Sequence, residues 1–177
     1  MSGAWVFVCG PSGAGKDSVL EAAHQLLSSR PDIVFARRMV TRAAQAGSDH
    51  DAVSEAVFLD LLASGGLSWH WQAHGYSYGI ARRYERDVLA GCRVVVNGSR
   101  EHVLGLAPAP GLRVVEVTAN PQQVASRLIQ RGRDSSSAVA DRLARNGSFS
   151  GLQADMVIVN DGALTDAGRC LADYLSK

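Results

Sequence analysis

The residues with the clearest chemical meaning lie at positions 10–16, which read Gly-Pro-Ser-Gly-Ala-Gly-Lys. This stretch matches the spacing G-x-x-x-x-G-K, in which glycines let backbone N–H groups surround phosphate oxygens. An apolar run at 4–9 precedes it, and apolar residues at helical spacing follow it at 18–27, so a strand and a helix should flank the loop. The helix N-terminus adds partial positive charge, and Lys16 can reach the β- and γ-phosphates of a nucleotide. We therefore predict a loop that binds the phosphates of ATP, not an empty tight turn.

The residue after this lysine departs from the motif. A Ser or Thr whose hydroxyl contacts Mg²⁺ usually stands there, whereas this chain has Asp17 followed by Ser18. A carboxylate is a hard oxygen ligand that could hold Mg²⁺ directly or through water. It could equally act only as a negative charge that favours the first helical turn. Mg²⁺ is the expected cofactor, and Asp17 is its candidate ligand.

A polar stretch at 132–137 is flanked by arginines on both sides. We predict that it is a lid which closes over ATP and excludes water. Arginines in such positions stabilise the charge on a phosphoryl group during transfer. The arginines assigned to this role are Arg131, Arg133 and Arg142. We interpret Arg127 and Arg145 as solvated side chains of the flanking helices, because acidic residues lie among them.

The composition fits one globular domain with a full hydrophobic core. The chain has 177 residues, 46% of them apolar, and a formal net charge of +1, which gives no electrostatic reason to expect nucleic acid or a membrane as partner. Cys9, Cys92 and Cys170 match neither metal-ligand spacing nor a disulfide framework. No apolar run reaches membrane-spanning length. We expect a cytoplasmic protein.

Strand and helix patterns alternate along the chain. The expected strands are 4–9, 33–40, 93–96, 112–117 and 155–159, and the expected helices are 18–27, 54–62, 121–130, 138–144 and 165–175. Residues 67–78 are rich in aromatics without a helical period, which indicates a small strand and turn region apart from the main sheet. The repeated strand–helix units predict an α/β fold with a five-stranded parallel sheet flanked by helices.

Beyond the phosphate loop, the chain resembles the guanylate kinase superfamily over nearly its full length. Thr41 and Arg42 are similar to the end of its Thr-Thr-Arg motif, which holds the phosphate of the acceptor. Residues 74–79 are similar to its His-Gly-x-Tyr-Tyr-Gly segment, so the resemblance assigns Tyr78 to the same phosphate. Asn160 lies in a stretch similar to the one beside the adenine, which implies a contact to ATP.

The residues that read guanine in that superfamily are absent. The corresponding positions fall near Arg38, Gln45, His50 and Trp69. A tryptophan cannot replace a carboxylate that accepts hydrogen bonds from guanine. We therefore do not expect guanylate kinase activity.

A closer resemblance is to the ribose 1,5-bisphosphate phosphokinase family of the same superfamily. Four stretches carry it, at 15–18, 38–42, 96–100 and 131–133, and Asp17 belongs to this family's pattern. The resemblance implies transfer of the ATP γ-phosphate to the 1-phosphate of ribose 1,5-bisphosphate. The product is 5-phosphoribosyl 1-diphosphate, and the reaction belongs to bacterial phosphonate catabolism.

This acceptor carries a second phosphate where a nucleotide carries a base. Arg38 stands at a guanine-reading position, and its planar guanidinium suits phosphate oxygens, although it could be a solvated residue at a strand end. Asn97 and Arg100 follow an expected strand end, so a role at the substrate or at Mg²⁺-bound water is plausible there. No catalytic base is proposed, because an acceptor phosphate is already ionised near neutral pH.

The implied assignments are as follows. The residues expected to bind ATP are Gly10, Pro11, Ser12, Gly13, Ala14, Gly15, Lys16, Asp17, Ser18, Arg131, Arg133 and Asn160. The residues expected to bind the acceptor are Arg38, Arg42, Tyr78, Asn97 and Arg100, and those expected to catalyse transfer are Lys16, Arg131 and Arg142. We expect one domain over 1–177, with its core at 1–40, 92–130 and 150–177, an acceptor-binding segment at about 41–91 and a lid at about 131–145.

Three alternatives stay open beside this interpretation. One is a kinase of another phosphorylated sugar or nucleotide. A second is a non-catalytic interaction module of the guanylate kinase type, which the intact phosphate loop disfavours. The third is a P-loop ATPase that drives mechanical work, which the short single domain disfavours. The expected partners are ATP and a small phosphorylated sugar.

Overall fold

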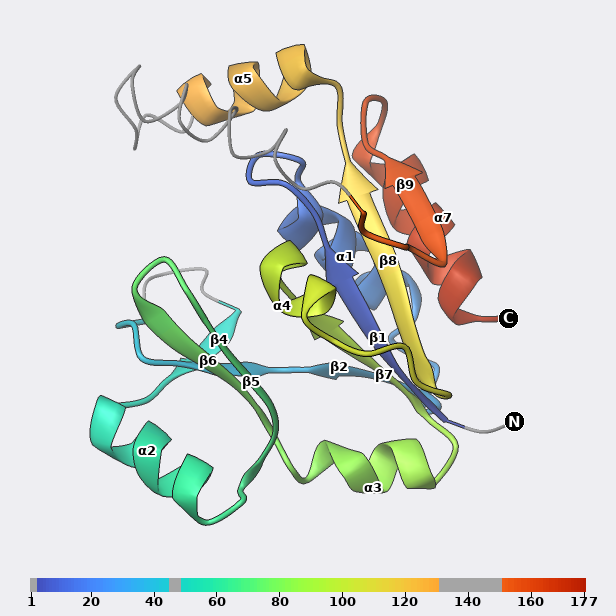
Figure 1. The fold of residues 1–177 in the computed structure, drawn as a ribbon. Helices are drawn as coiled ribbons and strands as arrows, with labels where there is room; N and C mark the ends of the chain where they lie inside the picture. The colour runs from blue at the N-terminus through green and yellow to red at the C-terminus, as the bar shows by residue number, and fades with distance from the viewer. Residues whose placement is uncertain (1–2, 45–48, 131–150) are drawn as a thin grey trace. The chain divides into compact units, whose positions relative to one another are not determined.

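The computed structural model describes residues 3–44, 49–130 and 151–177 (Figure 1). Its strands form a five-stranded sheet in the order β2-β7-β1-β8-β9 and a four-stranded sheet in the order β4-β3-β6-β5. The chain divides into two compact units. The hairpin unit comprises 1–6, 31–97 and 109–112, and the phosphate-loop unit comprises 7–30, 98–108 and 113–177.

The phosphate-loop unit is built from buried parallel strands and the helices that cover them. Strand β8 pairs in parallel with β9, and helix α7 packs against both β9 and α1. Gly168 allows the two helices to approach closely, since a Cβ there would lie 2.5 Å from the Cβ of Ala22. The elements are β1 (Ala4–Cys9, shared between the units), α1 (Lys16–Leu26), α4 (Arg100–Leu104), β8 (Leu112–Thr118), α5 (Pro121–Gln130), β9 (Met156–Val159) and α7 (Leu164–Leu175).

The hairpin unit carries the second sheet. Strands β5 and β6 form an antiparallel hairpin, and β6 also pairs antiparallel with β3, which pairs in parallel with β4. His74 and Gly75 turn the hairpin with φ values of 53° and 77°, as a two-residue type I′ turn requires. The elements are β2 (Ile33–Ala36), β3 (Arg38–Val40), β4 (His50–Ala52), α2 (Glu55–Ala63), β5 (Leu67–Ala73), β6 (Tyr76–Ala81), α3 (Tyr84–Leu89) and β7 (Arg93–Asn97).

The structure confirms the expected α/β fold with its five-stranded parallel sheet, and it confirms the separate strand region around the hairpin. Ser54 caps helix α2 as expected, because its hydroxyl accepts a hydrogen bond from the Val57 N–H. The expectation of one continuous strand over 33–40 was wrong. The chain leaves the first sheet after β2 and enters the second at β3, with only Arg37 between them.

Other differences concern short helices and the expected lid. The sequence did not predict α3 or α4, which have six and five residues and are too short for a helical period to emerge. The expected helix at 138–144 and the expected lid lie outside the described residues. The division into one core, an acceptor-binding segment and a lid stays a prediction.

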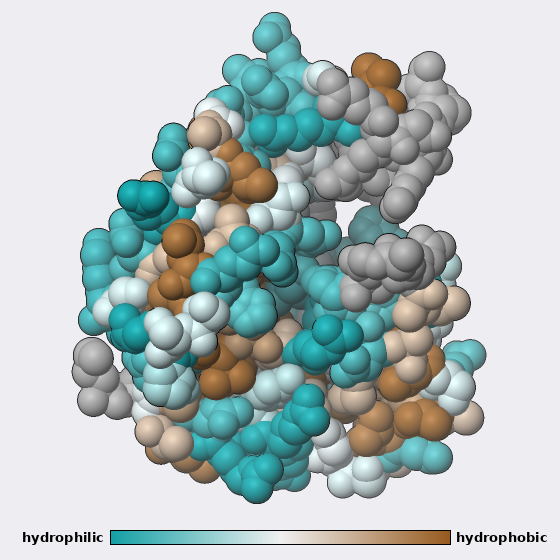
Figure 2. Space-filling model, turned by 180° about the vertical axis from the view of Figure 1, so that it is seen from behind, coloured by the Kyte–Doolittle hydropathy of each residue, from teal (hydrophilic) through white to brown (hydrophobic). Residues whose placement is uncertain are grey.

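One face of the molecule shows an ordinary mixture of apolar and hydrophilic residues. On the side of the molecule in Figure 2, apolar residues form small groups separated by hydrophilic ones, as is usual for folded proteins. Within the part of the chain that the structure describes, no helix is both long and apolar enough to cross a membrane.

Candidate functional site

The phosphate loop joins the end of β1 to the start of α1. Gly15 occupies the N-cap position with φ 83°, a left-handed conformation that favours glycine. A Cβ at Gly15 would also lie 2.5 Å from Nδ2 of Asn160. Both constraints explain the glycine immediately before the lysine. The first N–H groups of α1, which have no partner within the helix, are directed at the loop.

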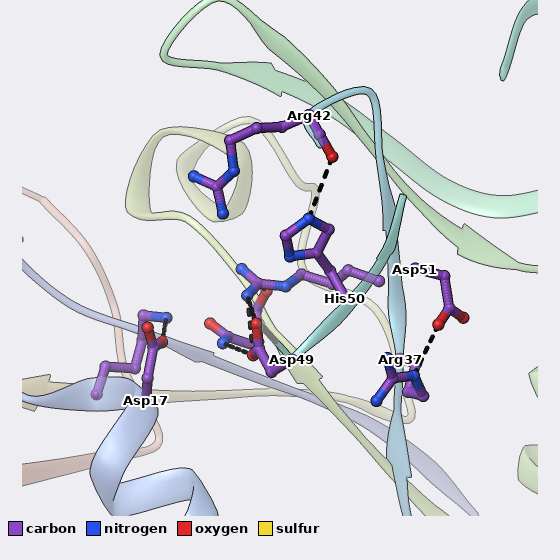
Figure 3. A network of polar contacts seen from close by, with 9 residues as sticks. Asp17, Arg37, Arg42, Asp49, His50 and Asp51 are labelled. Atoms are coloured by element: carbon purple, nitrogen blue, oxygen red, sulfur yellow. Dashed lines mark hydrogen bonds and ion pairs between the residues drawn. The ribbon is translucent and has the colours of Figure 1, made fainter. Parts of the chain in front are cut away.

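Lys16 and Asp17 form an ion pair at the start of α1. The Nζ atom of Lys16 lies 2.9 Å from Oδ1 of Asp17, and the two side chains are 15% and 66% exposed. Figure 3 shows this contact beside the helix end. The pair thus combines a largely buried cation with a carboxylate that remains open to solvent.

Two donors converge on the backbone of the phosphate loop. Nδ2 of Asn160 donates to the Ala14 carbonyl at 2.8 Å, and Nη1 of Arg127 donates to the same oxygen at 3.3 Å. Nη2 of Arg127 also donates to the Asn160 carbonyl at 2.9 Å. Asn160 is only 4% exposed. The sequence-based interpretation of Arg127 as a solvated residue was therefore wrong, because its guanidinium fixes the loop.

We expect Arg127→Leu to raise the KM for ATP about tenfold while the protein stays folded. The reason is that one charged donor to the loop backbone is lost, which is worth roughly 1.5 kcal/mol, whereas Asn160 still holds the Ala14 carbonyl. Steady-state kinetics with varied ATP measure the change. Arg169→Leu, at an exposed position of α7, is the matched control, and equal KM values for the two variants would contradict a role for Arg127 at the loop.

A second polar group lies in the same unit, on β1, β8 and α4. Burial, and then Glu116, raise the pKa of the Cys9 thiol to about 12, so this cysteine stays protonated and is no nucleophile near neutral pH. Burial lowers the pKa of Arg100, against the opposing effects of Glu116 and Cys9. Arg100, expected to bind the acceptor, is thus a buried residue whose electrostatic partners include Glu116, an acidic residue that sequence reasoning missed.

A cavity of about 270 Å³ opens where α5 begins and β9 ends. Its lining is polar and consists of Asn120, Gln122, Gln123, Ser126 and Asp161. Oδ1 of Asp161 accepts a hydrogen bond from the Asn120 N–H at 2.6 Å, which ties the two segments together. The cavity is large enough for a nucleotide base. One of its lining residues, Asp161, is the neighbour in sequence of Asn160, the residue expected beside adenine.

In the hairpin unit, a carboxylate is held between an arginine and an amide. Nη2 of Arg38 donates to both oxygens of Asp49, at 2.7 and 2.9 Å, and Nδ2 of Asn97 donates to Oδ2 at 2.9 Å (Figure 3). Nη1 of Arg38 also reaches the Asn97 carbonyl at 3.4 Å. The Arg38 side chain is 13% exposed and that of Asp49 is 51% exposed. Arg38 and Asn97, which were expected to bind the acceptor, therefore both contact Asp49, which the sequence analysis did not single out.

The neighbouring face of the four-stranded sheet is aromatic. Tyr78 stacks on Trp71 with ring centroids 5.5 Å apart and an interplanar angle of 7°, and the guanidinium of Arg38 lies 5.9 Å from the Tyr78 centroid. The guanidinium of Arg42 lies 5.8 Å from the ring of Tyr76. Arg42 is exposed, so its guanidinium is open to a ligand from solution.

The expected residues fall into three groups. The phosphate loop, Lys16, Asp17 and Asn160 come together in the phosphate-loop unit, which also contains Arg100. In the hairpin unit, Arg38 contacts Asn97 and Tyr78, and Arg42 follows β3. The residues outside the described ranges are Arg131, Arg133 and Arg142. Asp49 was missed because no local pattern links it to Arg38, eleven residues earlier, and the pairing of β3 with β4 brings this part of the chain back beside Arg38.

The fold and the phosphate loop define a P-loop kinase with the guanylate kinase fold. A crystal structure of guanylate kinase from Anaplasma phagocytophilum superposes with a TM-score of 0.72 at 20% identity, covering 99% of this chain and 85% of that chain. No family model matches the sequence.

Curated relatives identify the family more narrowly. A ribose 1,5-bisphosphate phosphokinase of Methylobacterium radiotolerans is 43% identical over 177 residues, covering 99% of this chain and 98% of that protein. One from Agrobacterium fabrum is 40% identical over 175 residues, covering 97% and 96%. The chain belongs to the ribose 1,5-bisphosphate phosphokinase family.

Proposed function

We propose that this kinase transfers the γ-phosphoryl group of ATP to the 1-phosphate of ribose 1,5-bisphosphate, which gives 5-phosphoribosyl 1-diphosphate and ADP. The observation that carries the proposal is the intact phosphate loop, with Lys16 at the start of α1, in a chain 43% identical to a ribose 1,5-bisphosphate phosphokinase. A location in the cytoplasm and a place in phosphonate breakdown accord with this activity.

The chemistry demands position and charge more than proton transfer. An oxygen of the 1-phosphate attacks the γ-phosphorus, and the bond from that phosphorus to the β–γ bridging oxygen breaks as ADP leaves. The backbone N–H groups of the loop hold the ATP phosphates, and Lys16 neutralises charge on the β- and γ-phosphates. Arg131 and Arg142 are proposed to stabilise the transferring group, and Arg133 to bind ATP.

We assign the acceptor to the hairpin unit. Arg42 and Tyr78 are proposed to bind the 1-phosphate. Arg38, held by Asp49 and the Asn97 carbonyl, is assigned to the acceptor beside them. The base of ATP is assigned to the cavity beside Asn160, whose own amide is committed to the Ala14 carbonyl.

Mg²⁺ is the proposed cofactor, and the donors of this chain fit it. Mg²⁺ in kinases takes one or two carboxylates and otherwise waters and substrate phosphates. Asp17 supplies an exposed carboxylate next to Lys16. When bound, the ion neutralises charge on the ATP phosphates. Among the described residues, no three His, Cys, Asp or Glu side chains gather to form a metal site of their own, so a site completed by ATP suits this chain.

Product analysis tests the proposed function. The enzyme is mixed with ATP and, separately, ribose 1,5-bisphosphate, GMP or ribose 5-phosphate, and the products are identified by mass spectrometry. We expect 5-phosphoribosyl 1-diphosphate from the first mixture and little product from the others. GDP formation at a higher kcat/KM would instead establish a nucleotide kinase.

We expect Asp17→Asn to raise the Mg²⁺ concentration needed for half-maximal activity about tenfold, with little effect on ATP affinity. The variant keeps the size of the side chain and removes its charge, which is the property that holds the cation. Asp17→Ser should also need more Mg²⁺ for half-maximal activity, because a hydroxyl does not restore the charge. Activity titrations against Mg²⁺ and equilibrium dialysis of ATP measure the two effects.

Glu116→Gln is the comparison variant, since the carboxylate of Glu116 acts on Cys9, the residue just before the loop. We expect its Mg²⁺ dependence to match that of the unmodified enzyme. Full activity of Asp17→Ser at ordinary Mg²⁺ would mean that Asp17 acts only as a charge at the helix terminus. If only Glu116→Gln changed the Mg²⁺ concentration needed for half-maximal activity, the ion would be assigned to Glu116 on β8.

A further inference from the structure

The strongest unassigned feature is the carboxylate of Asp49 in the hairpin unit. Its inner side is occupied by donors from Arg38 and Asn97, both largely buried, while half of the side chain faces solvent. Such support fixes the direction of a carboxylate. The solvent-facing side of this carboxylate can only accept hydrogen bonds, so a ligand group that meets it must be a donor.

The side chain of His50, the next residue, also calls for a hydrogen-bond donor. It is 3% exposed, and its Nε2 lies 3.3 Å from the Arg42 carbonyl. A carbonyl only accepts, so Nε2 carries the proton and, in the neutral ring, Nδ1 is an acceptor. Nδ1 is buried without a hydrogen-bond partner among the described residues. In Figure 3, one edge of the ring faces Arg42 and the other lies toward Asp49.

A donor without a partner lies on the same sheet face. Arg38 and His50 are register partners in the pairing of β3 with β4, so their side chains lie side by side. Nε of Arg38 is also buried and has no hydrogen-bond partner within the described ranges. A buried polar atom without a partner is costly. One group that both donates and accepts could satisfy Arg38 and His50 together.

Hydroxyl groups have this property, whereas a phosphate does not. A phosphate would satisfy Nε of Arg38 but would be repelled by Asp49 and could not donate to His50 when ionised. A sugar hydroxyl can donate to Asp49 or His50 and accept from Arg38. The stacked rings of Trp71 and Tyr78 on the same sheet offer an apolar surface suited to sugar C–H groups.

We propose that Asp49, held by Arg38 and Asn97 and assisted by His50, binds the ring hydroxyls of the acceptor sugar and selects acceptors that carry them. This inference rests on the proposed function, because it takes the acceptor to be a sugar phosphate. It gives Asp49 a role in specificity, and it makes Asn97 a positioning residue that acts through that carboxylate.

The test compares two acceptors, ribose 1,5-bisphosphate and 2-deoxyribose 1,5-bisphosphate, which share both phosphates. For the unmodified enzyme we expect kcat/KM to be about a hundredfold lower with the deoxy compound, since sites that pair a hydroxyl reject analogues without it. For Asp49→Asn we expect a large loss with the ribose compound and a smaller one with the deoxy compound. The ratio between them should fall to about tenfold or less.

This ratio is insensitive to partial misfolding, because any inactive fraction cancels between the two acceptors. Asp51→Asn is the matched control. Asp51 lies on β4, two residues after Asp49, and forms an exposed ion pair with Arg37, so its substitution should leave the ratio unchanged. His50→Phe, which keeps the volume of the ring and removes both nitrogens, should also lower the ratio.

Each outcome decides the question. A hundredfold ratio that survives in Asp49→Asn would overturn the inference and leave Asp49 as support for Arg38. So would equal turnover of both acceptors by the unmodified enzyme, the result expected if a water molecule satisfies Arg38 and His50. Failure of the proposed function itself is distinct, because the unmodified enzyme would then form no 5-phosphoribosyl 1-diphosphate from ribose 1,5-bisphosphate.

Discussion

Lys16→Ala should lower kcat/KM at least a thousandfold, a loss of about 4 kcal/mol of transition-state stabilisation. Lys16 is the cation of the phosphate loop, and the transfer develops charge on the oxygens that this ammonium group would meet. The loss should appear mainly in kcat. Turnover with saturating ATP and ribose 1,5-bisphosphate measures it.

The chain offers an unusually clean control, because Lys177 is its only other lysine. Lys177→Ala removes the same group from an exposed position near the C-terminal end of α7 and should leave turnover unchanged. The free energy of unfolding of Lys16→Ala should stay within about 1 kcal/mol of the unmodified protein, since the lost ion pair with Asp17 involves an exposed carboxylate. Near-normal turnover of a folded Lys16→Ala protein would remove the basis for the proposed kinase mechanism.

Gly10→Ala should destabilise the fold by about 3 kcal/mol, which lowers Tm by roughly 6–12 °C for a chain of this size. A Cβ at Gly10 would lie 2.0 Å from the carbonyl oxygen of Val117. That oxygen belongs to β8, the neighbour of β1 in the sheet. Relief of the clash would push the two strands apart and move the phosphate loop.

Gly162→Ala is the control for this substitution, because a Cβ there meets nothing within 4 Å. Its Tm should lie within about 2 °C of that of the unmodified protein, as is usual for surface substitutions. Thermal unfolding followed by circular dichroism compares the two variants. Equal Tm values would show that β1 and β8 can separate at Gly10 without cost.

The sequence predicted the parts of this protein that depend on local pattern. A continuous apolar run as short as 4–9, ended by a glycine, favours a buried strand over a helix. The phosphate loop was predictable for the same reason, because seven consecutive residues carry its whole geometry. Pro121 marked the start of α5, where its missing N–H costs nothing.

What the sequence did not predict depends on contacts between distant residues. No local signal divides β2 from β3, because residues 33–40 have the pattern of one strand throughout. The division arises from their partners, since β2 pairs with β7 in the first sheet and β3 pairs with β4 and β6 in the second. Arg127 has the composition of a solvated helix residue, yet Ala14, 113 positions away, is its partner. Asp49 and Arg38 likewise meet through strand pairing, which a single sequence does not reveal.

The distribution of tryptophan has a practical consequence for experiments in solution. All three tryptophans, Trp5, Trp69 and Trp71, belong to the hairpin unit. Trp69 lies edge-on to Trp5 with ring centroids 5.8 Å apart, and Trp71 stacks on Tyr78. The intrinsic fluorescence of this protein therefore originates from the unit to which we assign the acceptor. Tryptophan emission, excited at the red edge of indole absorption, should therefore change when a sugar phosphate binds there, and no attached dye is needed.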